Sequence, residues 1–141
     1  MTIEFTVKAR PVPMARPRVV RGHAYIPKRC ADYKRLVAAA AREAMQGKEP
    51  MTGAVACRIE LYYAIPKSYT CGKRLAAQYN RIKPVGRNTG DTDNHAKAIL
   101  DALNGVCWGD DAQVTRLTVY KRFDALGGDA VRVVLTGDDD D

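Results

Sequence analysis

The chain has 141 residues, 46% of them hydrophobic and 28% charged, which excludes an extensively disordered polypeptide and fits one domain with its own core. No apolar run is long enough to span a bilayer and no apolar leader opens the chain, so a cytoplasmic protein without membrane contact is expected. The net charge of +7, from 23 basic and 16 acidic residues, excludes a generally acidic protein.

The charge is unevenly distributed, because the last four residues are all aspartate. Without them, 23 basic residues face 12 acidic ones, a net charge of +11. A body this basic indicates a polyanionic partner such as nucleic acid, although a generally basic soluble domain has the same composition. We expect one folded domain over residues 1–137 and a disordered acidic tail over residues 138–141.

The first half of the chain predicts a strand, a small hairpin, a helix and a second strand. Residues 2–8 alternate between apolar and polar side chains, as a half-buried strand does. A proline-rich basic segment follows over residues 10–18, and a short hairpin is expected around the Arg-Gly pair at 21–22. Apolar residues at helical spacing predict a helix over 31–46, and alternation predicts a strand over 54–65.

The second half predicts two helices and two strands. A short helix is expected over residues 68–79, before a basic loop with glycine and proline, and a longer helix over 92–104. Strands follow over 113–123 and 130–136, joined by a hairpin-type connection. This order predicts an α/β (α+β) fold, with a mixed, mostly antiparallel sheet of about four strands and two main helices packed on one face.

The four cysteines are far apart in the sequence and form no C-x-x-C pair. Together with the two histidines they complete no zinc-binding pattern. We therefore expect isolated thiols, most of them buried.

Two carboxylates stand where the helix over 92–104 begins. Asp91 and Asp93 belong to the segment D-T-D-N-H-A-K at residues 91–97. Residues two apart in an extended segment point the same way, so both carboxylates can face one ion. Lys97 follows Asp93 by one helical turn and lies on the same side of the helix.

A second acidic pair, Asp110 and Asp111, stands in G-D-D-A-Q-V at residues 109–114. The pair returns to the start of the preceding helix only if residues 106–109 run back along it. Two carboxylates about 4 Å apart repel by about 4 kcal/mol at an effective dielectric near 20, and one lysine does not offset three of them. A divalent cation does, and hard oxygen ligands favour Mg²⁺ or Mn²⁺.

Each part of this pattern also has an ordinary structural explanation. Asp91 or Asp93 can cap a helix, Asp93 and Lys97 can form a surface ion pair, and Asp110 with Asp111 can form a turn. The residue types alone do not decide between these explanations and a metal site.

Three segments together resemble the RusA family of Holliday-junction resolvases. They are P-V-P-M-A-R-P-R at 11–18, D-T-D-N-H-A-K-A-I-L-D-A-L-N-G at 91–105 and W-G-D-D-A-Q-V at 108–114. With the order of strands and helices, the resemblance covers nearly the whole chain. It implies a homodimeric, Mg²⁺-dependent endonuclease, with Mn²⁺ as a substitute, that resolves four-way DNA junctions by paired symmetric nicks in recombination and repair, often in a prophage setting.

The resemblance also implies roles for single residues. It makes Asp91, Asp93 and Asp111 the metal-binding catalytic carboxylates and Lys97 the catalytic lysine. Asp110 and Asn94 become accessory residues of the same motifs. His95 departs from the apolar residue that is common in the family, and we interpret it as a tolerated surface change rather than a metal ligand.

DNA phosphates are the expected partners of the basic residues near these motifs. Those residues are Arg10, Arg16, Arg18, Arg21, Lys83 and Arg87. Two alternatives remain open: a non-catalytic DNA-binding protein of the same fold, and a nuclease that acts on other branched DNA. The intact set of three carboxylates and one lysine argues against the first.

Overall fold

A computed structural model describes residues 1–15, 18–65, 83–124 and 128–138. Its elements, in chain order, are β1 (Thr2–Val7), β2 (Arg18–Val20), β3 (His23–Tyr25), α1 (Lys28–Met45), β4 (Val55–Ala64), the 3-10 helix η2 (Arg87–Thr89), α3 (Thr92–Leu103), the 3-10 helix η3 (Asp111–Gln113), β5 (Val114–Asp124) and β6 (Ala130–Gly137). The helix predicted over 68–79 lies outside the described residues.

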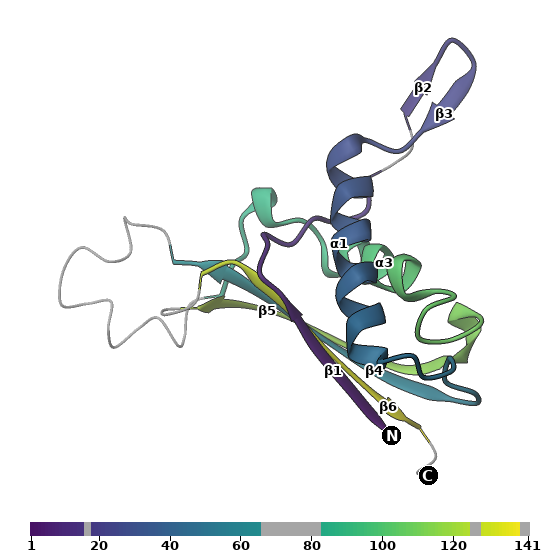
Figure 1. Ribbon diagram of the computed structural model, residues 1–141. Helices are drawn as coiled ribbons and strands as arrows, with labels where there is room; N and C mark the ends of the chain where they lie inside the picture. The colour runs from purple at the N-terminus through teal and green to yellow at the C-terminus, as the bar shows by residue number, and fades with distance from the viewer. Residues whose placement is uncertain (16–17, 66–82, 125–127, 139–141) are drawn as a thin grey trace, which may run out of the picture.

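Four strands form one sheet in the order β1-β6-β4-β5. The pairs β1–β6 and β6–β4 are antiparallel, whereas β4–β5 is parallel. The two long helices, α1 and α3, cover the same face of this sheet (Figure 1). The predicted fold class is therefore confirmed.

The hairpin expected between the last two strands is wrong, because β4 lies between β5 and β6 in the sheet. β4 carries buried side chains from Val55 to Tyr63 and pairs along both of its edges, as a central strand does. The turn residues after β5 predicted that β5 and β6 pair with each other. The apolar side chains of β4 instead favour its burial at the centre of the sheet, between these two strands.

The predicted boundaries of the other described elements agree with the structure to within about one residue, except at the start of α1. This helix begins at Lys28, three residues earlier than expected, with Pro27 at its N-cap position. Proline fits this N-cap position because it has no N–H to leave unpaired, while its carbonyl oxygen accepts a hydrogen bond from Ala31 N at 3.1 Å.

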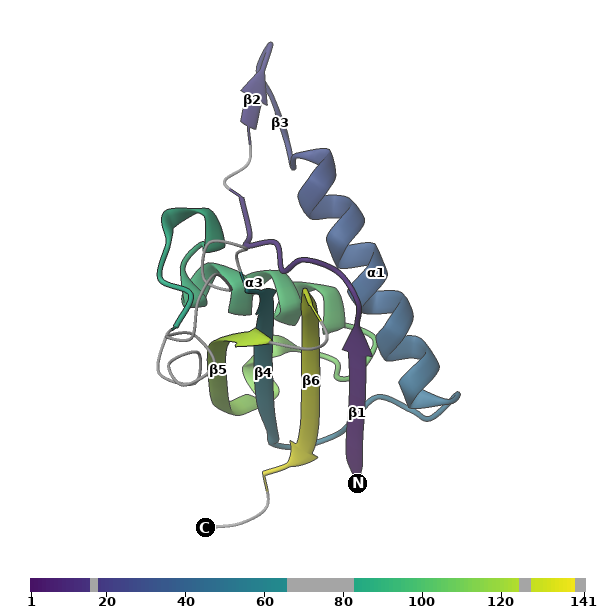
Figure 2. The same cartoon turned by 90° about the vertical axis from the view of Figure 1, so that its left-hand side faces the viewer.

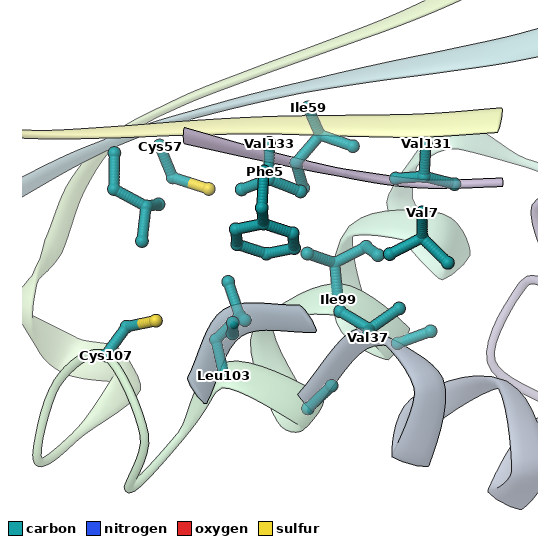
Figure 3. Packing of buried hydrophobic residues seen from close by; sticks show 14 of the residues in the cluster. Phe5, Val7, Val37, Cys57, Ile59, Ile99, Leu103, Cys107, Val131 and Val133 are labelled. Carbon is teal, nitrogen blue, oxygen red and sulfur yellow. The ribbon is translucent and has the colours of Figure 1, made fainter. Parts of the chain in front are cut away.

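The core lies between the sheet and the two helices. In Figure 3, Phe5 and Val133 of the sheet face Leu103 of α3, and all three are buried. Burying each side chain of this size contributes roughly 1.5–3 kcal/mol. This packing fixes α3 along the sheet and so fixes where its two ends lie.

The small hairpin of β2 and β3 stands away from the body, beyond the start of α1 (Figures 1 and 2). Its turn holds Arg21 at φ 53° and Gly22 at φ 81°, the two positive values of a type I′ hairpin turn. The prediction of a hairpin around this pair is confirmed. Val19 is 70% exposed, so the hairpin presents apolar as well as basic groups to its surroundings.

Three of the four cysteines, Cys30, Cys57 and Cys107, are buried free thiols, as predicted, and Cys71 lies outside the described residues. Burial raises the pKa of Cys57 to about 12 and that of Cys107 to about 11, which keeps both thiols protonated and unreactive. None of the helices within the described ranges is long and apolar enough to cross a membrane.

The predicted tail begins at Asp138, but this residue is held by the body of the protein. Its backbone N–H donates to Ala54 O at 2.9 Å, and its carboxylate accepts from Thr115 Oγ1 at 2.6 Å. Arg116 forms an ion pair with the same carboxylate at 3.2 Å. Of the four acidic residues, only 139–141 lie outside the described part.

Candidate active site

Two exposed carboxylates open helix α3. Asp91 occupies the N-cap position in an extended conformation, with φ −86° and ψ 142°, but its side chain makes no capping hydrogen bond. Asp93 lies in the first turn, and Lys97 is exposed one turn further along. Asp93 and Lys97 form no ion pair, and Asp101 of the same helix pairs instead with Lys34 at 2.7 Å. The helix-cap and ion-pair explanations therefore do not account for these carboxylates.

The backbone just before Asp91 is held by buried side chains. Thr89 O accepts a hydrogen bond from the Tyr63 hydroxyl at 2.9 Å and a second one from Nε2 of His95. A carbonyl oxygen can only accept, so Nε2 carries the hydrogen. Tyr63 ends the buried face of β4 and His95 lies in the first turn of α3, so the strand and the helix clamp this loop together.

His95 is fully buried, so its interpretation as a surface change is wrong. Burial lowers the pKa of its imidazole, with Lys121 and Arg10 adding to the effect, and the ring is neutral. Its Nδ1 atom is buried without a hydrogen-bond partner among the described residues. In the sequence, its position beside Ala96 and one turn before Ile99 was the signal that it faces the core.

Two basic side chains donate hydrogen bonds to backbone carbonyl groups on either side of Thr89. Lys121 Nζ donates to Gly90 O at 2.7 Å, and Arg10 donates to Asn88 O at 3.3 Å while its guanidinium lies 5.2 Å from the centre of the Tyr63 ring. Burial lowers the pKa of Lys121, and the nearby carboxylate of Asp91 acts in the opposite direction. Lys121 thus places a positive charge beside Asp91.

Sequence reasoning missed Lys121. The signal was present, because Val119, Lys121 and Phe123 share the face of β5 that is paired with the buried residues of β4. A charged residue at a core-facing position is unusual and indicates a specific partner.

Gly90 lets the proline-rich segment pack over the start of α3. Its φ is +80°, and a Cβ atom there would lie 2.8 Å from Cγ of Pro13 and 3.2 Å from Nε2 of His95. One residue further along that segment, Met14 N donates to Asn94 O at 2.9 Å. The backbone of Asn94, predicted as an accessory residue, thus joins this segment to α3.

The two residues of the second acidic pair have different hydrogen-bond partners. Asp110 is the N-cap of η3 and accepts a hydrogen bond from Ala112 N at 2.9 Å. Asp111 instead accepts from the Nε1–H of Trp108 at 2.8 Å, and this indole is fully buried. The segment D-D-A-Q at residues 110–113 therefore forms a capping box, in which Asp110 stabilises the turn. The hydrogen bond from the Trp108 indole fixes the orientation of the Asp111 carboxylate.

Gln113 closes this capping box. Its Oε1 atom accepts from Gly109 N at 2.9 Å and Asp110 N at 3.1 Å, and its Nε2 atom donates to Met51 O at 2.9 Å and Gly53 O at 3.0 Å. Sequence reasoning missed this role, although a glutamine three residues after an aspartate was the signal.

Replacing Gln113 by alanine removes all four of these hydrogen bonds. We expect the free energy of unfolding to fall by about 2 kcal/mol, because each lost bond to a partly exposed backbone group costs less than 1 kcal/mol. Urea denaturation measures the change. Gln113→Glu keeps the two acceptor contacts and loses the donor pair, so it is expected to fall between alanine and the wild type; a loss equal to alanine contradicts this account of the turn.

The structure does not bring Asp111 to Asp91 and Asp93 within one chain. Residues 105–109 stay at the C-terminal end of α3, where Val106 N and Cys107 N both donate to Leu103 O. From Asp91 to Asn104 the helix rises about 20 Å, at about 1.5 Å per residue. Figure 1 shows the loop before α3 and the turn before β5 at opposite ends of this helix.

No group of three or more histidine, cysteine or acidic residues in the described ranges can hold a metal ion. Within one chain, the residues of the predicted site are therefore divided into two groups, one at each end of α3. The first group has two free carboxylates with Lys97 and Lys121 nearby, and the second group has Asp111 alone.

The predicted DNA-binding residues lie mostly on the same side as the first group. Arg10 and the exposed Arg87 are next to the loop that leads into Asp91, and Lys83 is exposed at the start of the described part of that loop. Arg21 stands at the tip of the projecting hairpin. Arg16 and the side chain of Arg18 lie outside the described residues.

A basic chain with unpaired carboxylates at a helix start, flanked by lysines and arginines, has the features of an enzyme that acts on a phosphodiester backbone. Residues 8–135 match the model of the endodeoxyribonuclease RusA family. The chain belongs to this family and is an endodeoxyribonuclease, an enzyme that hydrolyses phosphodiester bonds within DNA. A Bacillus subtilis (strain 168) protein, the uncharacterized protein YqaN, is 32% identical over 127 residues, covering 86% of this chain and 87% of its own length.

Proposed function

We propose that this protein is a Mg²⁺-dependent, structure-selective endonuclease that resolves Holliday junctions by paired symmetric nicks, with Mn²⁺ as a substitute. The observation that supports the proposal most is the pair Asp91 and Asp93 at the start of α3. Both carboxylates are exposed, and neither has a hydrogen bond or ion pair in the described part of the chain. Their negative charges lie together with no structural role that explains them.

The donor set fits a hard divalent cation. Asp91 and Asp93 would hold it from one side, and Asp111 is the third carboxylate that the family motif assigns to the site. When bound, such an ion supplies Lewis-acid stabilisation of the charge that develops on the phosphate and a more acidic water molecule. The three cysteines in the described part of the chain, Cys30, Cys57 and Cys107, are buried in the core, so none of them offers a softer metal a ligand beside Asp91 and Asp93.

The residues around the carboxylates prepare the site for a phosphate. Lys97 is exposed one turn into α3 and is placed to stabilise charge on the phosphate or the leaving oxygen. Lys121 holds the Gly90 carbonyl and sets the backbone from which Asp91 extends. The Tyr63 and His95 contacts with Thr89 keep the same loop rigid.

DNA affinity in this proposal comes from basic residues around the loop and the hairpin. Arg10, Arg21, Lys83 and Arg87 contact phosphates, which gives strong salt dependence and little sequence information. Selection of a four-way junction comes from its shape. A two-fold symmetric junction that receives two symmetric nicks favours a two-fold symmetric homodimer.

Replacing Lys97 by alanine is expected to lower the junction cleavage rate about 100-fold, because one preorganised cation next to the developing charge is lost. The dissociation constant for the junction is expected to change less than about 5-fold, since one phosphate contact among several is removed. Single-turnover cleavage and a gel-shift titration measure the two quantities. Lys48→Ala, at the other end of α3, removes the same charge as a control, and equal rates for the two variants contradict the role of Lys97.

A comparison of substrates tests the proposed function. Labelled four-way junction, flap and linear duplex are incubated with the protein and Mg²⁺, and cleavage rates are compared. We expect symmetric nicks in the junction and at least about 100-fold slower cleavage of the duplex. Preference for the flap supports the alternative nuclease, and binding to the junction without cleavage supports a non-catalytic DNA-binding protein.

A further inference from the structure

The hairpin of β2 and β3 is attached at its base to the start of α3. Arg18, the first residue of β2, follows Met14 by four residues, which span at most about 14 Å. Met14 N donates to Asn94 O at 2.9 Å, and Asn94 is next to Asp93. The other end of the hairpin leads into α1, and the Sγ–H of Cys30 in the first turn of that helix donates to Met14 Sδ at 3.8 Å. Both ends of the hairpin thus lie close to the start of α3, and the hairpin projects from there away from the body (Figure 2).

The hairpin exposes a large share of the apolar side chains that reach the surface. Eight large apolar side chains are exposed in the described part of the chain, and four of them belong to the hairpin or to the residue that follows it. They are Val19 (70% exposed), Val20 (52%), Tyr25 (45%) and Ile26 (40%). Such a cluster on a projecting element leaves apolar surface in water and indicates a binding surface.

These apolar side chains lie on both faces of the hairpin. In the register of β2 and β3, Val20 is opposite His23 and Val19 is opposite Ala24. Side chains alternate between the two faces along each strand, so Tyr25 shares a face with Val20, while Val19 lies on the other face. A hairpin that packs on the body of a protein needs only one apolar face. One that is apolar on both faces fits between two apolar surfaces, and contacts on both sides would stabilise an isolated pair of strands that is otherwise marginally stable.

The charge around the hairpin favours DNA as the molecule that binds it. Residues 5–31 contain seven lysines and arginines and no aspartate or glutamate. Arg21 lies at the tip of the hairpin, and Lys28 and Arg29 are exposed at its base. Two copies of such a segment repel each other, whereas DNA phosphates attract it. At a branch point the last base pair of each arm has a face without a stacked neighbour, and this is a flat apolar surface that side chains can contact.

We propose that the hairpin inserts into the branch point of a DNA junction, with base pairs of neighbouring arms packed against Val20 and Tyr25 on one face and Val19 on the other. This inference rests on the proposed function, since it names the element with which that same enzyme distinguishes branched from linear DNA. In a linear duplex every internal base pair is stacked on both sides, so insertion requires unstacking and is unfavourable. In a junction the unstacked faces already exist, so the hairpin adds affinity for branched DNA alone.

Binding without metal tests the inference separately from cleavage. A triple variant combines Val19→Thr, Val20→Thr and Tyr25→Ala. Threonine keeps the β-branched shape of valine, and all three positions are exposed, so the hairpin and the body are expected to fold. In a chelator, the affinity for a labelled junction is expected to fall about 30-fold and the affinity for a linear duplex less than about 3-fold. An unchanged preference for the junction in the triple variant overturns the inference.

Two matched variants separate the apolar contacts from the charge and from the tyrosine hydroxyl. Arg21→Asn removes the charge at the tip, and Asn-Gly is itself a favoured pair in a type I′ turn, so the turn is kept. This variant is expected to weaken binding to junction and duplex equally, by about 3-fold. Tyr25→Phe keeps the aromatic ring and is expected to bind the junction like the wild type. If Arg21→Asn loses the preference for the junction as fully as the triple variant does, the hairpin acts through its charge and the inference is wrong.

A fluorescent adenine analogue next to the branch point reports the insertion directly. Its emission depends on stacking, so it is expected to change when saturating wild-type protein binds in the chelator and to stay constant with saturating triple variant. The same analogue in the middle of one arm is the control and is expected to change with neither protein. An equal change at the branch point with both proteins would show that these side chains do not contact it.

Sedimentation distinguishes DNA from a protein as the molecule that binds the hairpin. The triple variant is expected to have the same oligomeric state as the wild type, because its altered side chains contact DNA. A change of oligomeric state assigns the apolar side chains to a contact between copies of the chain and overturns the inference. If the wild-type protein prefers the junction through the hairpin but does not cut it with Mg²⁺, the proposed function fails and the inserted hairpin stands.

Discussion

Replacing Asp93 by asparagine abolishes cleavage in our account, with a loss of at least about 1,000-fold, or about 4 kcal/mol in activation free energy. Asparagine keeps the size of the side chain but removes the charge that balances a divalent cation. Because Asp93 is exposed and has no partner in the described part of the chain, the fold does not depend on it. Binding of the junction without metal is expected to be unchanged or tighter, since one negative charge near the phosphates is removed.

Asp101→Asn is the matched control for this variant. It makes the same change on the same helix, two turns further along, at an exposed carboxylate that pairs with Lys34. An exposed ion pair contributes at most about 1 kcal/mol, so we expect a small loss of stability and a cleavage rate within a few-fold of the wild type. Equal cleavage by Asp93→Asn and Asp101→Asn in a labelled-junction assay contradicts the assignment of Asp93.

Gly90→Ala is expected to lower the free energy of unfolding by about 3 kcal/mol and to reduce cleavage strongly. Gly90 has φ +80° and ψ 172°, a conformation that is essentially restricted to glycine. A methyl group there also meets Pro13 at 2.8 Å, so the proline-rich segment or the loop must move. Since Asp91 is the next residue, any movement of the loop displaces this carboxylate.

Gly105→Ala separates the backbone effect from the contact. Gly105 also has φ +80°, but no atom lies within 4 Å of the position of its Cβ. Its replacement is expected to cost about 1 kcal/mol from backbone strain alone and to leave cleavage nearly unchanged. Urea denaturation and junction cleavage of both variants make the comparison. Equal losses would show that the packing of Pro13 against Gly90 is unimportant for the site.

Much of the fold could be predicted from periodicity alone. The alternation over residues 2–8 and 54–65 and the helical spacing before Asn104 gave elements that the structure contains. The pairing of strands could not be predicted in this way, because periodicity reports which face of a strand is buried and not which strand lies beside it. The error at the connection between β5 and β6 followed from that limit.

The assignment of Asp91, Asp93 and Asp111 to one site came from the motifs and stays a prediction. The local roles of the second acidic pair could not be predicted, because only the structure shows that Asp110 caps η3 and that Asp111 accepts a hydrogen bond from Trp108. The spacing left open whether the chain returns along α3, and the hydrogen bonds of residues 105–107 show that it does not. The contributions of Tyr63 and Lys121 depend on contacts between distant segments, which a single sequence does not reveal.

The central claim is that the carboxylates at the start of α3 belong to a divalent-cation site of a junction-cleaving nuclease. The most direct test is the cleavage of a labelled four-way junction by the wild-type protein, with added Mg²⁺ and with a chelator instead. We predict symmetric nicks in the presence of Mg²⁺ and binding without nicks in the chelator. Cleavage that continues at the same rate in the chelator, or a junction that is bound but never cut with Mg²⁺, contradicts the claim.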